Sequence, residues 1–254
     1  MARSDRATQL AVLARNQCNR VVRYHLAGGH RQDETGEVWL VRATAPRLCT
    51  FVDVGANVGD WTALVRLYAP GAAGLLFEPS VGALGELRCR FGNQRGIEIV
   101  DAAVAAEPGE AKFFEEPGAG EASSMVPGHA PAGSSARRVR VTTLDDELDT
   151  RGIERVDLMK VDAEGYDFEV LRGASTSLRE YRVAVIQFEY NRPWARAGAT
   201  LAGAIGMLAE HGYETFLLRG DGLEKIDHEF YGEFFDYANF VALSPAAQPL
   251  MAAL

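Results

Sequence analysis

The sequence contains few cysteines, and they are widely separated. Its three cysteines, Cys18, Cys49 and Cys89, form no Cys-x-x-Cys motif anywhere in the 254 residues. This spacing excludes both a cysteine-based zinc site and a disulfide framework. Reduced thiols are typical of the cytoplasm, and we therefore expect a cytoplasmic protein.

Long apolar runs and a surplus of basic residues are missing as well. No stretch reaches the roughly 18 apolar residues of a membrane-spanning helix, and residues 10–14 are too short for a signal-peptide core. The 26 Lys and Arg residues are outnumbered by 35 Asp and Glu residues, which gives a net charge of −9. Because nucleic acids are bound by clustered cations, we expect neither a nucleic-acid partner nor a membrane partner. The sequence does not determine the oligomeric state and is compatible with a homodimer.

The composition that remains is ordinary for a soluble globular protein, with 47% apolar and 24% charged residues. A chain of this length forms one large domain or two small ones. We divide it into an N-terminal helical segment, residues 1–46, and a larger domain, residues 47–254. A helix is expected over residues 4–26 and is predicted to end at Gly28-Gly29. The N-terminal segment is interpreted as an appendage on the larger domain.

Strand-like apolar runs alternate with helical repeats from residue 48 onwards, which indicates a mostly parallel sheet with helices on both faces. The late strands are separated by an acidic, aromatic loop at 219–239, and we expect the last strand to be antiparallel. The turn at 107–110 predicts a hairpin that extends the sheet edge. The expected strands are 48–54, 74–78, 97–100, 111–115, 139–141, 157–161, 183–188, 213–218 and 240–243, and the expected helices are 60–69, 79–91, 144–151, 166–172 and 200–211.

Residues 116–136 form a long segment rich in Gly, Ala, Pro and Ser. A loop of this length inside a compact domain is usually functional or disordered. Because it lies between elements of the core, we interpret it as a mobile lid over the active site. A plain insertion is the alternative.

The stretch from Phe51 to Asp60 predicts a nucleotide-binding turn. A buried strand ends in Gly55-x-x-x-Gly59, and a helix follows, which is the arrangement that places a ligand at a helix N-terminus. Asn57 occupies the position of the middle glycine in the NAD fingerprint, so a dinucleotide is disfavoured. No Gly-Lys-Ser/Thr follows the turn, which excludes a P-loop.

Two acids identify the nucleotide more closely. Asp53 precedes the glycine turn, where it would repel a phosphate but attract a cation. Glu78 follows the next strand, where a carboxylate accepts hydrogen bonds from ribose hydroxyls. S-adenosylmethionine has an ammonium group, a sulfonium group and no phosphate, and it fits both acids. A non-catalytic protein, or one that binds NAD or a sugar nucleotide with the same turn, is the alternative.

Three groups of motifs resemble the FkbM family of S-adenosylmethionine-dependent methyltransferases. The most specific is Lys160-x-Asp162-x-Glu164-Gly165, whereas the glycine turn alone would be a weak signal. The resemblance covers about residues 48–243, and the segment 34–39 is similar to the family's lead-in. The other matching motifs are 51–59 with 77–79, 141–145, 169–174 and 187–190.

The resemblance implies a Rossmann-like class I methyltransferase fold, with a seven-stranded sheet whose last strand is antiparallel. It also implies methyl transfer to a hydroxyl group of a small-molecule acceptor, either a glycoside or a polyketide-type natural product. Such a reaction is a tailoring step in secondary metabolism. Ser123-Ser124 resembles the family's serine pair that faces the cofactor. The residues expected at the cofactor are Asp53, Gly55, Asn57, Gly59, Glu78, Pro79, Ser80, Ala102, Ser124 and Asp162.

Methyl transfer to an alcohol needs a base or a metal, because a hydroxyl is a weak acid. Asp162 ends the strand next to the glycine turn, and Glu189 and Asn191 end the neighbouring strand. Three such oxygen ligands suit Mg²⁺, which would lower the pKa of a bound hydroxyl. The alternative is that Glu189 and Asn191 only cap the strand end or bind the N-terminal segment.

Asp162, Glu164, Lys160 and His129 are the candidate catalytic residues. Lys160 either takes part in catalysis or balances the charge of buried acids. His129 lies in the expected lid and would act as a general base once the lid has closed.

Overall fold

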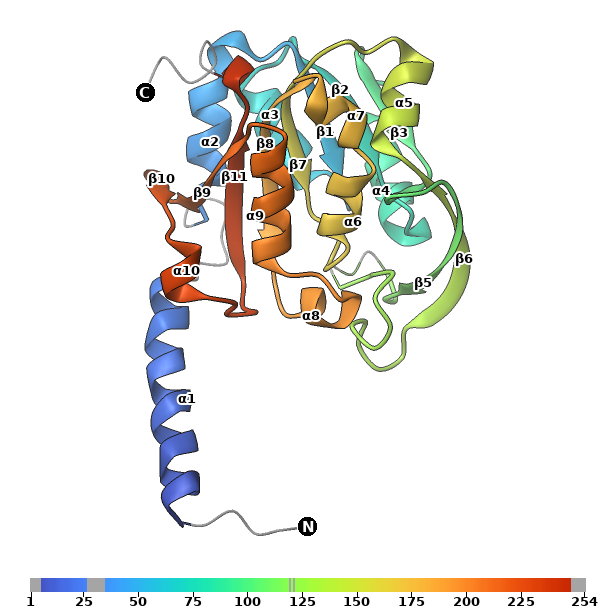
Figure 1. Cartoon of the computed structure of the whole chain (residues 1–254). Helices are drawn as coiled ribbons and strands as arrows, with labels where there is room; N and C mark the ends of the chain where they lie inside the picture. Colours follow the sequence, from blue (N-terminus) through green and yellow to red (C-terminus); the bar gives the residue numbers. More distant parts are fainter. Residues whose placement is uncertain (1–5, 27–34, 119, 121, 248–254) are drawn as a thin grey trace.

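The computed structural model describes residues 6–26, 35–118, 120 and 122–247. Its centre is an eight-stranded sheet in the order β10-β9-β11-β8-β7-β1-β2-β3 (Figure 1). The strands of this sheet are β1 (Thr50–Val54), β2 (Ala73–Phe77), β3 (Ile97–Val100), β7 (Val156–Val161), β8 (Val183–Tyr190), β9 (Glu214–Arg219), β10 (Gly222–Lys225) and β11 (Ala238–Leu243).

Five neighbouring strands of this sheet are parallel to one another, as expected: β3, β2, β1, β7 and β8. Their sequences are nearly continuous apolar runs, which is typical of strands covered on both faces. β11 lies antiparallel between β8 and β9, so the prediction of an antiparallel last strand is confirmed. Because parallel strands end at the same edge, the residues that follow β1, β2, β7 and β8 come together there.

The sheet has one strand more than the seven expected, because residues 219–239 are not only a loop. β10 pairs antiparallel with β9 across the two-residue turn Gly220-Asp221. A two-residue turn with glycine at its first position favours a tight hairpin. Leu223 is the only large apolar residue of β10, so this edge strand gives no alternating apolar pattern in the sequence.

A second, three-stranded sheet consists, in order, of β4 (Ala103–Val104), β6 (Ser135–Thr142) and β5 (Gly109–Glu115). β5 pairs antiparallel with β6 and not with β3, so the prediction that a hairpin at 107–110 extends the main sheet is wrong. Phe113 of β5 packs with Val139 of β6 and with Met125 in an apolar cluster of its own, and this packing joins the two strands.

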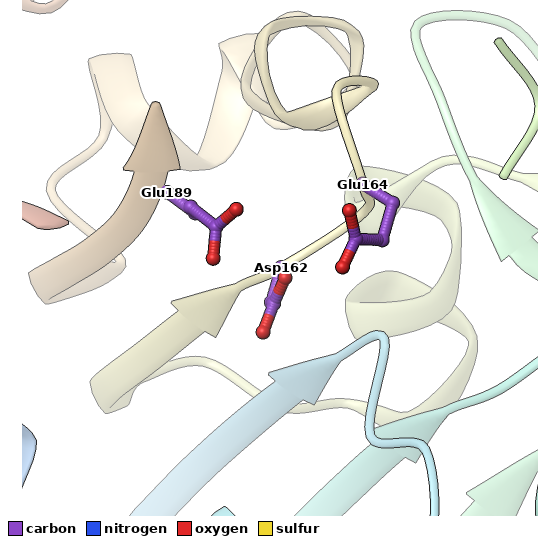
Figure 2. Close-up of side chains that lie close together, drawn as sticks. All are labelled: Asp162, Glu164 and Glu189. Atoms are coloured by element: carbon purple, nitrogen blue, oxygen red, sulfur yellow. The ribbon is translucent and has the colours of Figure 1, made fainter. Parts of the chain in front are cut away.

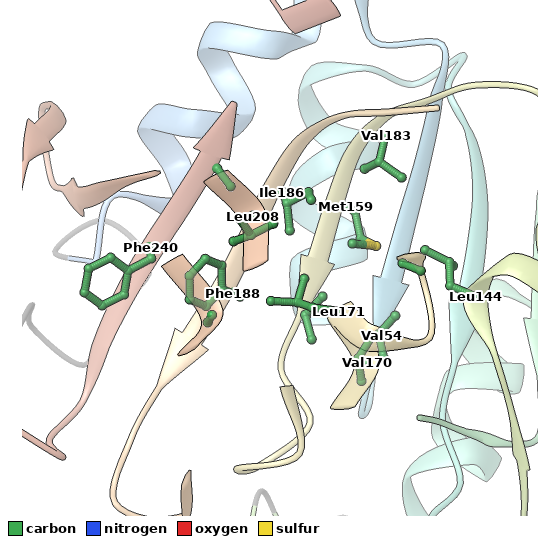
Figure 3. Packing of buried hydrophobic residues seen from close by; sticks show 14 of the residues in the cluster. Val54, Leu144, Met159, Val170, Leu171, Val183, Ile186, Phe188, Leu208 and Phe240 are labelled. Atoms are coloured by element: carbon green, nitrogen blue, oxygen red, sulfur yellow. The ribbon is translucent and has the colours of Figure 1, made fainter. Parts of the chain in front are cut away.

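Helices cover both faces of the main sheet, as expected. One face carries α2 (Glu37–Thr44), α3 (Asp60–Tyr68) and α4 (Val81–Phe91). The other face carries the cluster in Figure 3, which includes side chains of α5 (Leu144–Arg151), α6 (Asp167–Arg172), α7 (Ser175–Arg179) and α9 (Leu201–Glu210). The remaining helices after α1 are the short α8 (Pro193–Ala197), α10 (His228–Tyr231), η1 (Ala45–Arg47) and η2 (Pro245–Ala247).

The first helix, α1 (Arg6–Leu26), confirms the helix expected over residues 4–26 and projects away from the domain in Figure 1. Leu26 is buried in the core, whereas Leu10 and Leu13 are exposed. The expected helix end at Gly28-Gly29 lies outside the described residues. Within the described part of the chain, no helix is long and apolar enough to cross a membrane.

We expect the core to depend strongly on Phe188 of β8. Its fully buried ring stacks on Phe240 and Trp194, with ring centroids 5.6 and 6.2 Å away. Phe188→Ala should lower the free energy of unfolding by about 3–5 kcal/mol, because it leaves a cavity. Phe230→Ala is the matched control, since this ring is 78% exposed. Equal losses for the two variants in urea denaturation would contradict this assignment of the core.

Candidate active site

The turn after β1 is fixed by close contacts between main chains. Gly55 and Asn57 have positive φ angles of 79° and 48°, and the N–H groups of Gly55 and Ala56 both donate to the carbonyl of Phe77. A Cβ on Gly55 would lie 1.9 Å from the carbonyl oxygen of Asp162. Only glycine therefore allows the end of β1 to approach the end of β7 this closely.

A cavity of about 1080 Å³ opens where these strands end. Its described lining includes one cation, Lys160, and an excess of carboxylates. Such a wall repels phosphates and attracts positively charged ligands. It therefore fits S-adenosylmethionine, which has two cationic groups and one carboxylate. The lining carboxylates are Glu37, Asp60, Glu78, Asp162, Glu164 and Glu189.

Glu78, directly after β2, is the buried acid on the side of the cavity expected to hold the ribose. Its two oxygens accept the backbone N–H groups of Asn57 at 2.8 Å and Ser80 at 2.7 Å. Burial raises the pKa of Glu78 to about 7, although both hydrogen bonds oppose the shift. The hydrogen bonds hold the carboxylate still, and its remaining lone pairs can accept ribose hydroxyls.

Asp53 does not line the cavity, so its expected direct contact with the cofactor is not seen. It is fully buried, and its Oδ2 accepts the hydroxyl of Thr62 at 2.6 Å. Burial raises the pKa of Asp53 to about 6, and neighbouring Lys160 opposes the shift. β1 and β7 place Asp53 and Lys160 side by side in register. Asp53 therefore contributes charge from beneath the cavity.

Lys160 is surrounded by acids. Its Nζ lies 3.0 Å from Oδ2 of Asp162 and 3.5 Å from Oε1 of Glu37. Burial alone would lower the pKa of Lys160, but Asp162, Glu37 and Asp53 together raise it well above the usual value. A lysine in these surroundings stays charged. Its geometry matches the charge-balancing role, one of the two roles that the sequence left open.

Three carboxylates that line the cavity face one another (Figure 2). Asp162, Glu164 and Glu189 can each place one oxygen within 4.8 Å of the others. Burial, together with the charges of Asp162 and Glu164, raises the pKa of Glu189 well above its usual range. Oδ1 of Asp162 is buried and has no hydrogen-bond partner. Oxygen donors in this arrangement fit a hard cation such as Mg²⁺.

The cluster contains two of the three metal ligands expected from the sequence, Asp162 and Glu189, together with Glu164. The third expected ligand, Asn191, donates its Nδ2 to Oε1 of Glu189 at 2.5 Å, and its Oδ1 is buried without a hydrogen-bond partner. Asn191 therefore orients Glu189, in the way that hydrogen-bonding neighbours orient metal ligands in proteins. Its role as a ligand stays a prediction.

The loop after β7 is held in shape by a residue that the sequence did not single out. Glu164 has a positive φ of 49°, which is uncommon for a residue with a side chain. The carboxylate of Asp167 accepts the N–H groups of Ala163 at 3.2 Å and Gly165 at 3.1 Å. These bonds turn the chain so that Glu164 and Asp162 reach the same space.

The segment expected to be a lid lies against this loop. Residues 116–134 connect β5 to β6, and Ser123 and Met125 line the cavity. Ser124 does not line it, because its hydroxyl donates to the carbonyl of Glu164 at 2.7 Å. Of the predicted serine pair, Ser123 is therefore the member at the cofactor cavity. Movement of this lid stays a prediction.

His129, the candidate base in the lid, does not line the cavity. Its Nε2 lies 3.0 Å from Oε2 of Glu164. Burial raises the pKa of Glu164, and the contact with His129 opposes the shift. The pair places the imidazole of His129 next to the carboxylate cluster.

The other predicted cofactor residues divide into two groups. Pro79 and Ala102 line the cavity. Gly59 and Ser80 do not, because they begin helices: Gly59 precedes α3, and the hydroxyl of Ser80 accepts the N–H of Ala83 at the start of α4. A Cβ on Gly59 would lie 2.5 Å from the ring of Phe91, so this glycine allows α3 and α4 to pack closely.

The lining residues that the sequence reasoning did not assign to the site include Glu37, Trp61 and Tyr237. Trp61 belongs to the helical repeat after the turn. Glu37 lies in the segment 34–39. This segment resembles the lead-in of the family, but the resemblance implied no role for Glu37. Tyr237 lies just before β11. No sequence pattern pointed to it, because only the pairing of β11 with β8 brings it to the site.

Taken together, the parallel sheet, the glycine turn, the buried acid after β2 and the acidic cavity define a Rossmann-like methyltransferase that uses S-adenosylmethionine. The sequence profile described as the methyltransferase FkbM domain matches residues 53–215, which contain the glycine turn, Glu78 and most of the cavity lining. The chain belongs to the FkbM methyltransferase family.

The chain is also similar to individual proteins. The chain is 24% identical over 213 residues to the AMB antimetabolite synthetase AmbE of Pseudomonas aeruginosa, an alignment that covers 69% of this chain and 10% of AmbE. The chain thus spans about a tenth of the length of this curated relative. Its fold is similar to the crystal structure of methyltransferase FkbM from Methylobacillus flagellatus, with a TM-score of 0.50 and 16% identity, over 76% of this chain and 43% of that one.

We expect Gly55→Ala to disrupt the site. The added methyl group would collide with the carbonyl of Asp162, and we expect a loss of about 3 kcal/mol in unfolding free energy together with weaker binding of S-adenosylhomocysteine. Gly152→Ala is the control, because Gly152 also has a positive φ, of 63°, but a methyl group added there would meet no atom within 4 Å. It should lose only about 1 kcal/mol. Calorimetry and denaturation would contradict the prediction if the two variants behaved alike.

The buried Glu78 predicts a pH dependence of stability for the ligand-free protein. Its pKa of about 7 in the folded state is above the ordinary 4.5, so protonation favours folding. This contribution is complete below pH 4.5 and is lost as the pH rises through 7, and it amounts to roughly 3 kcal/mol at most. Glu78→Gln should flatten the fall in unfolding free energy over this interval. The exposed Glu86→Gln should not, and an unchanged slope in Glu78→Gln would refute the assignment.

Proposed function

We propose that this protein is an O-methyltransferase that acts on a hydroxyl group of a sugar or polyketide-type natural product. The observation that carries the proposal is the carboxylate cluster of Asp162, Glu164 and Glu189 at the edge of the cofactor cavity. An alcohol must lose its proton during transfer, and this cluster offers both proton acceptors and metal ligands. The name of the relative AmbE, an antimetabolite synthetase, supports a role in secondary metabolism.

On the cofactor side, the residues act by position and charge. S-adenosylmethionine, when bound, supplies an activated methyl group on a positively charged sulfur. Glu78 accepts the ribose hydroxyls, and Gly55 leaves room for the ligand to approach the main chain. Asp53 and the acids around Lys160 make the potential of the site negative, which favours a cationic donor.

On the acceptor side, we propose that Asp162, Glu164 and Glu189 hold Mg²⁺. The metal, when bound, would lower the pKa of an acceptor hydroxyl. Asp162 is fixed by its ion pair with Lys160, and Glu189 by its hydrogen bond from Asn191. In a metal-free reaction Glu164 takes the proton directly, because its raised pKa makes it a better base than an exposed carboxylate.

The alternative of a protein that binds NAD or a sugar nucleotide is less well supported. Either ligand brings a pyrophosphate, and Lys160 is the sole cation among the described lining residues. Because Lys160 already faces Asp162 and Glu37, it is poorly placed to bind a phosphate. A family member that has lost catalysis would keep the cofactor cavity but show no turnover.

The test is transfer of a labelled methyl group from S-adenosylmethionine to a panel of glycosides, macrolides and small phenols, with and without Mg²⁺. Asp162→Asn should lower kcat by roughly 100-fold or more while leaving the affinity for S-adenosylhomocysteine nearly unchanged. Asp149→Asn is the matched control, because Asp149 lies on the surface in an ion pair with Arg182. A chelator that leaves turnover unchanged would exclude the metal, and wild-type turnover by Asp162→Asn would exclude the proposed site.

A further inference from the structure

We propose that Glu37 binds the α-ammonium group at the amino-acid end of the cofactor, so that the N-terminal segment completes the cofactor site. The inference rests on the use of S-adenosylmethionine, but not on the identity of the acceptor. Glu37 is the first residue of α2 and lies outside the matched family domain at 53–215. It nevertheless lines the same cavity as Gly55, Glu78 and Lys160.

The order of the strands places Glu37 at the correct end of the ligand. β1 lies between β2 and β7 in the sheet, so Glu78 is on one side of the glycine turn and Lys160 on the other. A nucleoside with its ribose at Glu78 extends its amino-acid arm across the turn, toward β7. Glu37 lies at that end, because its Oε1 is 3.5 Å from Nζ of Lys160.

Glu37 is held rigidly in this position. Only 6% of its surface is exposed, and its Oε1 accepts a hydrogen bond from Nε2 of Gln187 at 2.8 Å. Gly36 before it has a φ of 85°, and a Cβ there would lie 2.1 Å from the carbonyl oxygen of Arg219. Leu40 of α2 is fully buried in the core. A carboxylate fixed in this way binds a cation without a further loss of side-chain entropy.

The excess of negative charge around Lys160 also favours the binding of a second cation. Lys160 is one ammonium group next to three carboxylates, those of Glu37, Asp53 and Asp162. One positive charge cannot balance three negative charges, and buried charges are costly unless they are paired. The α-ammonium of the cofactor can provide a second positive charge, and Glu37 is the member of the three that lies on α2. Asp53 does not line the cavity, and Asp162 belongs to the carboxylate cluster with Glu164 and Glu189.

Two ligands that differ at the amino-acid end separate recognition from support of the fold. S-adenosylhomocysteine has the α-ammonium group, and 5′-methylthioadenosine has the same nucleoside and thioether without it. In calorimetry on the full chain, Glu37→Gln should raise the Kd of S-adenosylhomocysteine roughly 10- to 100-fold, the usual effect of losing a charge-assisted contact. The Kd of 5′-methylthioadenosine should stay unchanged. Arg42→Gln, on the exposed side of α2, should change neither value.

Each other outcome overturns the proposal. Equal losses for the two ligands would show that Glu37 only supports the cavity wall, and an unchanged Kd for S-adenosylhomocysteine would show that it makes no contact. Glu37→Asp keeps the charge and shortens the side chain, so it replaces Glu37→Gln if that variant unfolds, and it should give the same selective loss. If wild-type protein binds S-adenosylhomocysteine but methylates no acceptor, the methyl-transfer proposal fails while the Glu37 test still stands.

Discussion

The site depends on one buried ammonium group surrounded by carboxylates. Lys160 lies on the central strand β7, next to Asp53 on β1 and Gln187 on β8. Its charge allows Asp53, Asp162 and Glu37 to remain close together at the carboxyl edge of the sheet. Without a cation at this point, burial and mutual repulsion would destabilise this arrangement of carboxylates.

The same excess of negative charge sets the chemistry of the cavity. Burial raises the pKa of Glu78, Glu164 and Glu189, which means that the site holds these charges at a cost. A ligand with a sulfonium and an ammonium group relieves part of that cost on binding. Relief of repulsion among the acids of the site therefore favours a cationic cofactor.

The sequence was sufficient where a local pattern determines the structure. The apolar run before Gly55 and the motif from Lys160 to Gly165 identified two strand ends, and the parallel arrangement then brought Glu189 to them. Pairing between distant segments could not be predicted in this way. β5 has an apolar side chain, Phe113, that suits either neighbour, and only the position of Val139 and Met125 decides its partner. Glu37 was missed for a similar reason, because only the close approach of Gly36 to Arg219 and the contact with Lys160 bring it to the cavity.

The contact between Gly36 and Arg219 has a consequence for the order in which the protein is completed. The backbone before Glu37 packs against the end of β9, and Gln187, which holds Glu37, is also 3.3 Å from Oδ1 of Asn239 on β11. During synthesis, α2 leaves the ribosome long before either strand exists. The segment can therefore dock fully only after β9 and β11 have been synthesised, and a product that lacks these strands would leave the wall of the cavity near Lys160 open.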